Sequence, residues 1–227
     1  MGTRFSGIRL ISFDLDDTLV ATRATIEPRV RQTAAMARQQ MGLRLSAAAE
    51  EAAVTSLLTV EPDVRWDALI AAFGLDPASE AALRVREAYA SSASDFLNAM
   101  KGASEVLAEL SSRFLVGVLT NGAKRTQREK LRRLGLDRWV NLVLTSDEVG
   151  AHKPAATGFH ALCRQLGVEP GEAIHVGDSP INDIVAAQAA GFAGAVWLRS
   201  SEPHPEPDGP WRADATIDRL ADLLGLV

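Results

Sequence analysis

Three carboxylates within four residues mark the start of the chain, in the run from Asp14 to Thr18 (DLDDT). The apolar stretch from Ile8 to Phe13 precedes them and is typical of a buried strand. Because alternate side chains of a strand point to one face, Asp14 and Asp16 can approach the same ligand. One such carboxylate can attack phosphorus or carbon, while its neighbour protonates a leaving group and then activates water. For Asp17 we expect a helix-capping or turn role.

A second acidic cluster, from Gly177 to Asp183 (GDSPIND), follows another apolar strand. Parallel strands deliver their carboxyl ends to one edge of a sheet, so Asp178 can converge with Asp14. Carboxylate oxygens with few histidine or cysteine neighbours suit Mg²⁺, which joins one or two carboxylates to a substrate phosphate. Two unit charges about 4 Å apart at an effective dielectric of about 20 interact by about 4 kcal/mol, so several carboxylates would repel a phosphate dianion. The pattern therefore predicts a divalent cation and a lysine at the site.

Two further segments can supply donors to a phosphate at the same edge. Lys153 stands in a loop ahead of an expected helix and offers a positive charge. Thr120 and Asn121 precede a glycine after another expected strand, and a hydroxyl, a side-chain amide and a flexible glycine at such a turn can bind phosphate through side-chain and backbone donors. Taken alone, each segment also fits a role without a ligand. Lys153 could be a solvated surface lysine, and Thr120 or Asn121 could be a helix N-cap.

Apolar runs alternate with helical periodicity through most of the chain. We expect strands at Ile8–Phe13, Phe114–Leu119, Val140–Leu144, Ala173–Val176 and Ala193–Leu198. We expect helices at Ala103–Leu110, Lys124–Leu134, Thr157–Leu166, Ile181–Ala190 and Ile217–Leu224. This alternation predicts an α/β fold with a parallel sheet that is covered on both faces.

The segment from about Ile26 to Phe96 interrupts this alternation, because its periodicity is helical throughout. One helix face is marked by apolar residues that step by four and three: Ile26, Val30, Ala34, Ala37 and Met41. Further helices are expected at 46–59, 64–73 and 78–95. The chain therefore divides into a core, 1–19 with 98–227, and an inserted helical domain, 20–97. A helical insert beside an acidic site can act as a lid.

The composition argues against two classes of partner, nucleic acid and the membrane. The net charge is −5, from 24 lysines and arginines against 29 aspartates and glutamates, which argues against nucleic acid as a main partner. The basic helix that starts at Lys124 is accordingly expected to present a solvated face. No stretch reaches the roughly 20 apolar residues that span a bilayer, so we expect no membrane segment. The proline-rich stretch from Glu202 to Pro210 predicts a surface loop.

Cysteine usage bears on the compartment. Cys163 is the only cysteine, so the chain has no intrachain disulfide, and a reducing compartment such as the cytoplasm is the natural expectation. We expect Cys163 to pack as a small hydrophobe. His175, in an expected strand, is interpreted as a core histidine.

The acidic and phosphate-binding segments resemble, in order and position, the motifs of the haloacid dehalogenase-like superfamily of hydrolases. The first motif corresponds to Asp14–Thr18, the second to Thr120 and Asn121, the third to Lys153 and Pro154, and the fourth to Gly177 and Asp178 with Asp183. The resemblance covers roughly 8–20 and 98–200, and the helical insert looks like the type-one cap of subfamily I. It implies a Rossmann-like parallel sheet of about five strands, in agreement with the strand count above.

The resemblance also implies a role for each acidic residue. Asp14 would be the nucleophile that forms an aspartyl-phosphate. Asp16 would be the general acid and then the general base for the attacking water. Mg²⁺ would be held by the Asp14 and Asp178 carboxylates and the backbone carbonyl of Asp16, with Asp183 in the outer shell of the metal.

For the phosphate, the resemblance implies that Thr120 and the Asn121 amide bind its oxygens. Lys153 would pair with both Asp14 and the phosphate, and Thr18 would order the turn after the nucleophile. The function implied is that of a Mg²⁺-dependent phosphomonoesterase, of the phosphatase branch, that acts on a small phosphorylated metabolite. The protein would be a monomer or a homodimer.

Three alternatives stay open at this point. A carbon–halogen hydrolase of the same family would work without metal, and such enzymes generally lack the second aspartate of the first motif, whereas this chain keeps Asp16. A phosphomutase shares the core motifs and differs mainly in its cap. A binding or scaffold protein on the same frame is disfavoured by the complete set of acidic and lysine positions.

Overall fold

Two compact units make up the chain, for which a computed structural model describes residues 4–60, 65–199 and 211–227. The first unit comprises Met1–Ala21 and Asn98–Val227, and we call it the core unit. The second comprises Thr22–Leu97, and we call it the helical unit. The proline-rich stretch expected to form a surface loop, 202–210, lies outside the described residues.

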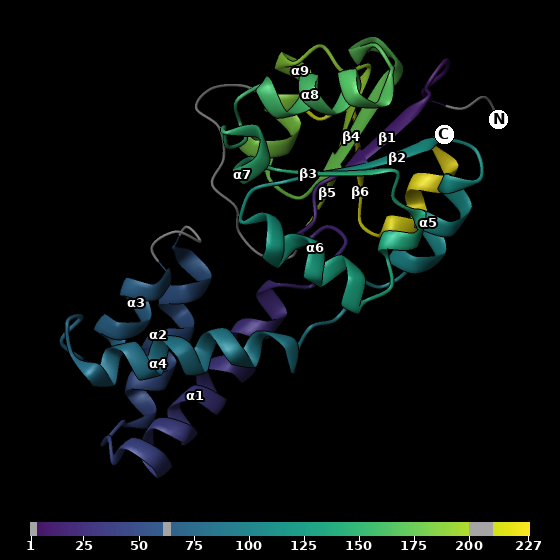
Figure 1. The fold of residues 1–227 in the computed structure, drawn as a ribbon. Helices are drawn as coiled ribbons and strands as arrows, with labels where there is room; N and C mark the ends of the chain where they lie inside the picture. Colours follow the sequence, from purple (N-terminus) through teal and green to yellow (C-terminus); the bar gives the residue numbers. More distant parts are fainter. Residues whose placement is uncertain (1–3, 61–64, 200–210) are drawn as a thin grey trace. The chain divides into compact units, whose positions relative to one another are not determined.

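A parallel sheet forms the middle of the core unit, so the predicted α/β fold is confirmed (Figure 1). The strand order is β3-β2-β1-β4-β5-β6, and every neighbouring pair is parallel. The strands are β1 (Leu10–Phe13), β2 (Leu115–Thr120), β3 (Leu142–Thr145), β4 (Ala173–Gly177), β5 (Gly194–Leu198) and β6 (Ala215–Ile217). The sheet thus contains a sixth strand, β6, beyond the five that the sequence indicated.

The central strand β1 lies between β2 and β4, and its four residues are all buried. Phe13, its last residue, is level with Val118 of β2 and Val176 of β4. The ladder continues one residue further, because the backbone N–H of Asp14 donates to the carbonyl of Val176 at 2.9 Å. This register brings the end of β1 beside the end of β4, so the residues that follow the two strands emerge together.

Helices cover both faces of the sheet, as expected for parallel strands joined by crossovers. Figure 1 shows α8 and α9 on one face and α5 and α6 on the other. The α-helices of the core unit are α5 (Ala103–Ser111), α6 (Lys124–Arg133), α7 (Ser146–Val149), α8 (Thr157–Leu166) and α9 (Ala186–Ala189). Short 3₁₀ segments lie at η4 (Asp137–Trp139), η5 (Pro170–Glu172) and η7 (Leu220–Gly225).

Two expected helices of the core unit differ from the prediction. The segment after β4 begins as a π-helical turn, η6 (Pro180–Val185), and becomes α-helical only in α9. In this turn the backbone N–H groups of Asp183 and Ile184 both donate to the carbonyl of Ser179. Near the C-terminus, the expected helix Ile217–Leu224 is instead the end of β6 followed by the 3₁₀ segment η7, which packs beside α5.

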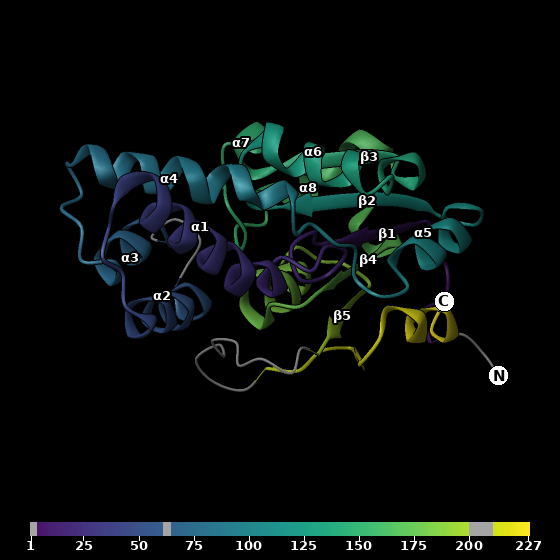
Figure 2. The ribbon, with the colours of Figure 1, turned by 90° about the horizontal axis from the view of Figure 1, so that it is seen from below.

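The described residues of the helical unit form four α-helices, drawn in purple to blue in Figure 2. They are α1 (Ile26–Met41), α2 (Ala47–Thr59), α3 (Arg65–Ala72) and α4 (Glu80–Ser91), with 3₁₀ turns at η1 (Arg23–Thr25) and η3 (Ser92–Ser94). The expected face of α1 is confirmed, since Ile26, Val30, Ala34 and Ala37 are buried in the core of this unit. Gly42 ends α1 in the left-handed conformation, with a φ of 67°. Within the described ranges, none of the helices is long and apolar enough to cross a membrane.

Aromatic rings pack together in an apolar core of the core unit, around Phe159 of α8. Phe159 is fully buried and makes edge-to-face contacts with Phe192 and His175, at centroid distances of 5.3 and 5.0 Å. Cys163, on the same helix, is 2% exposed, and burial raises the pKa of its thiol to about 11. The expectation that this cysteine packs as a small hydrophobe is confirmed.

The buried ring of Phe159 gives a test of this core. We expect Phe159→Ala to lower the free energy of unfolding by about 3–5 kcal/mol, because it leaves a cavity under the sheet. Leu83→Ala is the matched control, since Leu83 is 56% exposed. Urea unfolding followed by circular dichroism would measure both variants. Equal midpoints for the two would contradict the packing described above.

Candidate active site

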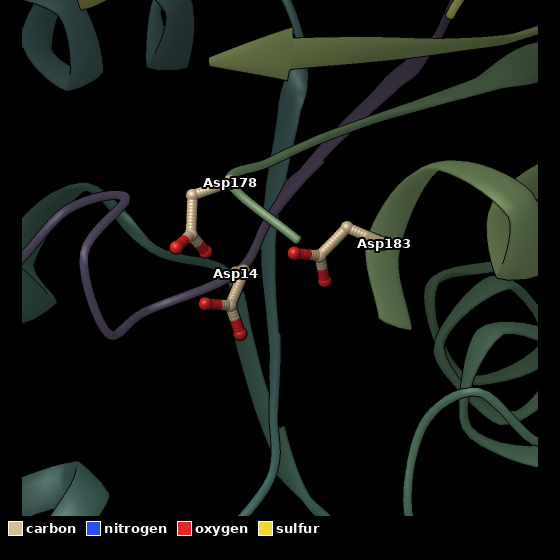
Figure 3. Close-up of side chains that lie close together, drawn as sticks. All are labelled: Asp14, Asp178 and Asp183. Carbon is tan, nitrogen blue, oxygen red and sulfur yellow. The ribbon is translucent and has the colours of Figure 1, made fainter. Parts of the chain in front are cut away.

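Three aspartates converge at the carboxyl ends of β1 and β4 (Figure 3). Asp14 follows β1, Asp178 follows β4, and Asp183 lies in the turn η6. Each offers one carboxylate oxygen, and these three oxygens lie within 4.8 Å of one another. All three side chains are buried. The expectation that acidic groups from the two ends of the chain meet at one edge of the sheet therefore agrees with the structure.

Lys153 lies among these carboxylates. Its ammonium nitrogen Nζ is 2.6 Å from Oδ1 of Asp14 and 2.6 Å from Oδ1 of Asp183. The side chain is buried together with both partners. The alternative of a solvated surface lysine is therefore excluded, and Lys153 provides the positive charge that the acidic cluster requires.

Asp183 is held on every side by hydrogen bonds. Its Oδ2 accepts from the backbone N–H of Ser179 at 2.9 Å, and its Oδ1 lies 3.3 Å from Nε2 of His175. The other ring nitrogen of His175, Nδ1, is 2.6 Å from the hydroxyl of Ser12 in β1. Burial lowers the pKa of His175, so its neutral form donates from Nε2 to Asp183 and accepts the hydroxyl of Ser12. The predicted core histidine thus also orients a carboxylate of the site.

The four charged groups perturb one another's ionisation. Burial raises the pKa of Asp14 to about 7, against the opposing charge of Lys153. Burial, together with the charges of Asp183 and Asp14, also raises the pKa of Asp178 well above its usual range. Burial alone would raise the pKa of Asp183, but the charge of Lys153 holds that pKa below its ordinary value. Burial would likewise lower the pKa of Lys153, and the charges of Asp14 and Asp183 hold it above normal.

The side chain of Asn121 braces the loop that carries Lys153. Its Oδ1 accepts from the backbone N–H of Lys153 at 2.8 Å, and its Nδ2 donates to the Lys153 carbonyl at 3.1 Å. The next residue, Gly122, donates its backbone N–H to the hydroxyl of Ser146 at 2.9 Å. The loop after β2 and the loop that carries Lys153 are therefore fixed to each other through one carboxamide.

Asp16 is held by helix α6. Its Oδ2 accepts from Nε2 of Gln127 at 2.8 Å, and its Oδ1 pairs with the ammonium group of Lys130. The same Nε2 of Gln127 is 2.8 Å from the hydroxyl of Thr120, at the end of β2. The prediction that this basic helix presents only a solvated face is therefore wrong at Gln127 and Lys130. The sequence did carry a signal, since a glutamine and a lysine three residues apart share one face of a helix.

The turn after Asp14 is tight. Asp17 has a φ of 60°, a left-handed conformation that aspartate tolerates better than most residues, and its N–H donates to the carbonyl of Val20 at 2.6 Å. This agrees with the turn role expected for Asp17. The hydroxyl of Thr18 lies 3.5 Å from Oδ1 of Asp178, and the indole N–H of Trp197 donates to the carbonyl of Asp178 at 2.9 Å.

The charges at the centre of the site do not balance. Among the described residues, three buried carboxylates face one ammonium group, that of Lys153, and burial lowers the pKa of His175, which disfavours a second positive charge there. Buried charge that lacks a partner is costly, and oxygen ligands of this kind suit a hard divalent cation. The set of three carboxylates therefore fits a Mg²⁺-sized ion.

Comparison with known proteins gives concordant matches. A family model described as haloacid dehalogenase-like hydrolase matches residues 8–191. The glyceraldehyde 3-phosphate phosphatase of Methanopyrus kandleri is 31% identical over 231 residues, which cover 97% of this chain and 97% of that protein.

Solved structures extend the comparison to the whole fold. The hydrolase YfnB of Bacillus subtilis, solved with magnesium bound, has a TM-score of 0.76 at 21% identity, covering 95% of this chain and 96% of that one. A 2-haloacid dehalogenase from Pseudomonas syringae has a TM-score of 0.67 at 28% identity, covering 96% of this chain and 97% of that one. The order of helices and strands along this chain is therefore one that known hydrolases share.

Gly177 offers a direct test of the geometry at the end of β4. A Cβ atom at this position would lie 2.3 Å from Cγ of Asp183, so any side chain would displace that carboxylate. We expect Gly177→Ala to cost about 1–3 kcal/mol of stability by overpacking and to impair the site. Gly171→Ala is the matched control, because a Cβ there meets nothing within 4 Å. Thermal unfolding of both variants would measure this loss of stability. A Gly177→Ala protein as stable as the wild type would contradict the close approach of Gly177 and Asp183.

Lys153 offers a second test, of the charge balance. Lys153→Met keeps the length of the side chain and leaves three carboxylates without their cation, which should cost about 3–5 kcal/mol. We expect added Mg²⁺ to restore part of this loss, since it replaces the missing charge. Lys101→Met, at an exposed lysine, is the control. Denaturant unfolding with and without Mg²⁺ measures the effect, and equal stability of the two variants would contradict it.

Proposed function

Because the chain belongs to the haloacid dehalogenase-like hydrolase family, we propose that it is a Mg²⁺-dependent phosphomonoesterase that works through Asp14. One observation carries the proposal: the carboxylates of Asp14 and Asp178 lie together at one sheet edge, with Lys153 bonded to Asp14. A buried nucleophile with an adjacent cation and a place for a metal ion matches the needs of phosphoryl transfer, which are positioning and charge neutralisation.

Mg²⁺ would be held by the carboxylates of Asp14 and Asp178 and by the backbone carbonyl of Asp16. Asp183 would stay in the outer shell, since its oxygens already accept from Lys153, His175 and Ser179. When bound, the ion would neutralise the phosphate and orient it toward the nucleophile.

In the first step, a carboxylate oxygen of Asp14 attacks phosphorus and the bond between phosphorus and the ester oxygen breaks. The electron pair of that bond goes to the leaving oxygen, which takes the proton that Asp16 carries when it enters this step in its acid form. Lys153, 2.6 Å from Asp14, keeps the attacking group oriented and offsets the charge of the phosphate. The products of this step are an alcohol and an aspartyl-phosphate.

In the second step, water attacks the phosphorus of the aspartyl-phosphate. Asp16, now a carboxylate, takes a proton from that water, and inorganic phosphate leaves Asp14 as a free carboxylate. The hydroxyl of Thr120 and the backbone N–H of Asn121 would bind phosphate oxygens in both steps. The side chain of Asn121 is engaged with the Lys153 backbone, so only its backbone amide is assigned to the phosphate.

We assign the chemistry to the core unit and the choice of substrate to the helical unit, Thr22–Leu97, as a cap. The similarity to a protein named glyceraldehyde 3-phosphate phosphatase supports a small phosphorylated metabolite as the substrate class. A monomeric or homodimeric state, a cytoplasmic location and the absence of nucleic-acid binding stay predictions.

The resemblance to a solved 2-haloacid dehalogenase keeps carbon–halogen hydrolysis as the alternative. Asp16 separates the two. A halide leaves without a proton, whereas an alkoxide needs a donor, and here a second carboxylate lies two residues after the nucleophile. This feature favours the phosphatase.

The proposal is tested by phosphate release from 4-nitrophenyl phosphate and a panel of phosphorylated sugars and acids. We expect activity that needs Mg²⁺ and disappears with EDTA. Asp14→Asn should lower kcat by about 10³-fold or more, because it removes the nucleophile. Asp218→Asn, at an exposed aspartate paired with Arg199, should leave kcat unchanged.

Acid-quenched protein treated with ³²P-labelled substrate should carry label that hydroxylamine removes, as expected for an acyl phosphate. Full activity of Asp14→Asn, or in EDTA, would refute the mechanism. Release of halide from 2-haloacids without phosphate release would establish the alternative, and isomerised product without phosphate release would indicate a mutase.

A further inference from the structure

We propose that Gln127 and Lys130 are positioning residues for the second step of the reaction, in which Asp16 is a carboxylate, and that they fix this carboxylate from helix α6. The inference rests on the proposed function, because it assigns Asp16 the proton transfers. It adds two residues that lie outside the four motifs on which the function is based, and it gives one face of α6 a role in the site.

The burial pattern along α6 sets these two residues apart. Gln127 is only 2% exposed on a helix that otherwise carries mostly charged side chains. Lys130 has a side chain that is 19% exposed, whereas its neighbour Arg132 is 65% exposed. Three residues apart, Gln127 and Lys130 lie on one face of the helix, which is the face turned to Asp16.

Both oxygens of the Asp16 carboxylate are engaged by this face. Gln127 donates to Oδ2 at 2.8 Å, and Lys130 pairs with Oδ1. Two donors on different oxygens define both the position and the rotation of a carboxylate, which a single ion pair does not. Charge-assisted bonds of this kind are also stronger than neutral ones.

Gln127 further ties Asp16 to the phosphate-binding turn after β2. Its Nε2 lies 2.8 Å from the hydroxyl of Thr120 and 2.9 Å from the carbonyl of Asn121. The three acceptors, on Asp16, Thr120 and Asn121, share the two hydrogens of this amide nitrogen. Because all three contact one atom, their distances from one another are restricted. One side chain therefore sets the spacing between the proton-transfer group and a phosphate donor.

Lys130 also supplies a second positive charge to the site. Asp14 and Asp16 are close enough for their charges to interact, and Lys153 is already engaged by Asp14 and Asp183. A second ammonium group at Asp16 offsets the additional negative charge without loosening Lys153. The site thus contains two lysine–aspartate pairs, one at the proposed nucleophile and one at the proposed acid and base.

Four variants test the inference in the full chain with saturating Mg²⁺ and 4-nitrophenyl phosphate. Lys130→Met and Gln127→Leu remove one donor each at similar side-chain length. Lys130→Arg keeps the charge, and Arg125→Met removes one charge from an exposed position of the same helix. Steady-state kinetics and thermal unfolding would be measured for each variant.

We expect Lys130→Met and Gln127→Leu to lower kcat by about 10–100-fold, the usual effect of losing a residue that orients a reacting group. KM should stay the same or fall, because slower hydrolysis of the phosphorylated protein does not weaken substrate binding. Lys130→Arg should recover most of the activity, and Arg125→Met should match the wild type.

Three results would overturn the inference. A raised KM with unchanged kcat in Lys130→Met would make Lys130 a substrate ligand, and kcat equal to that of Arg125→Met would make the ion pair irrelevant to the reaction. A kcat loss that Lys130→Arg does not recover, accompanied by an equally lowered unfolding midpoint, would reduce the pair to a structural contact. Failure of the proposed function itself is seen in other measurements, because Asp14→Asn, or the wild-type protein in EDTA, would then keep full activity.

Discussion

An excess of buried negative charge is the constraint on which the rest of this site depends. Asp14, Asp178 and Asp183 bring three carboxylates within 4.8 Å, and Lys153 supplies the one ammonium group among them. Such a cluster is stable only if every oxygen has a partner or a cation. The surrounding structure is organised to meet this demand: a glycine at the end of β4 leaves room for Asp183, and a buried histidine and a backbone amide bind its oxygens.

The sheet makes this arrangement possible at low cost. Parallel neighbours β1 and β4 are in register to their last residues, so Asp14 and Asp178 emerge side by side without a long loop to position them. The carboxamide of Asn121 then fixes the loop of Lys153 by two hydrogen bonds to its backbone. Rigid strand ends and short loops hold the reacting groups in place, which is the condition under which positioning contributes to catalysis.

Several features were predictable because they follow local rules. The strands from β1 to β5 are apolar runs, and the face of α1 shows in the spacing of its apolar residues. The strand β6 and the π-helical turn η6 were not predictable. The strand β6 has only three residues, and η6 contains Asp183, whose contacts are formed only in the folded chain. Helix α6 was misjudged in part because its many arginines and lysines are typical of a solvated face, and composition does not reveal which residue of such a helix is buried against Asp16.

The sequence by itself determined the types of the reacting groups, their order, and the strands after which they stand, because alternation of apolar runs and helical periods is a local property of the chain. Tertiary structure decided the remaining charge pairs. The resemblance of the motifs implied the pairing of Lys153 with Asp14, whereas only the folded chain joined Lys153 to Asp183 and Lys130 to Asp16, across separations that no local pattern encodes. The physical reason is that electrostatic and hydrogen-bond partners are chosen by distance in space, and the register of the sheet and the packing of α6 set that distance only once the chain has folded.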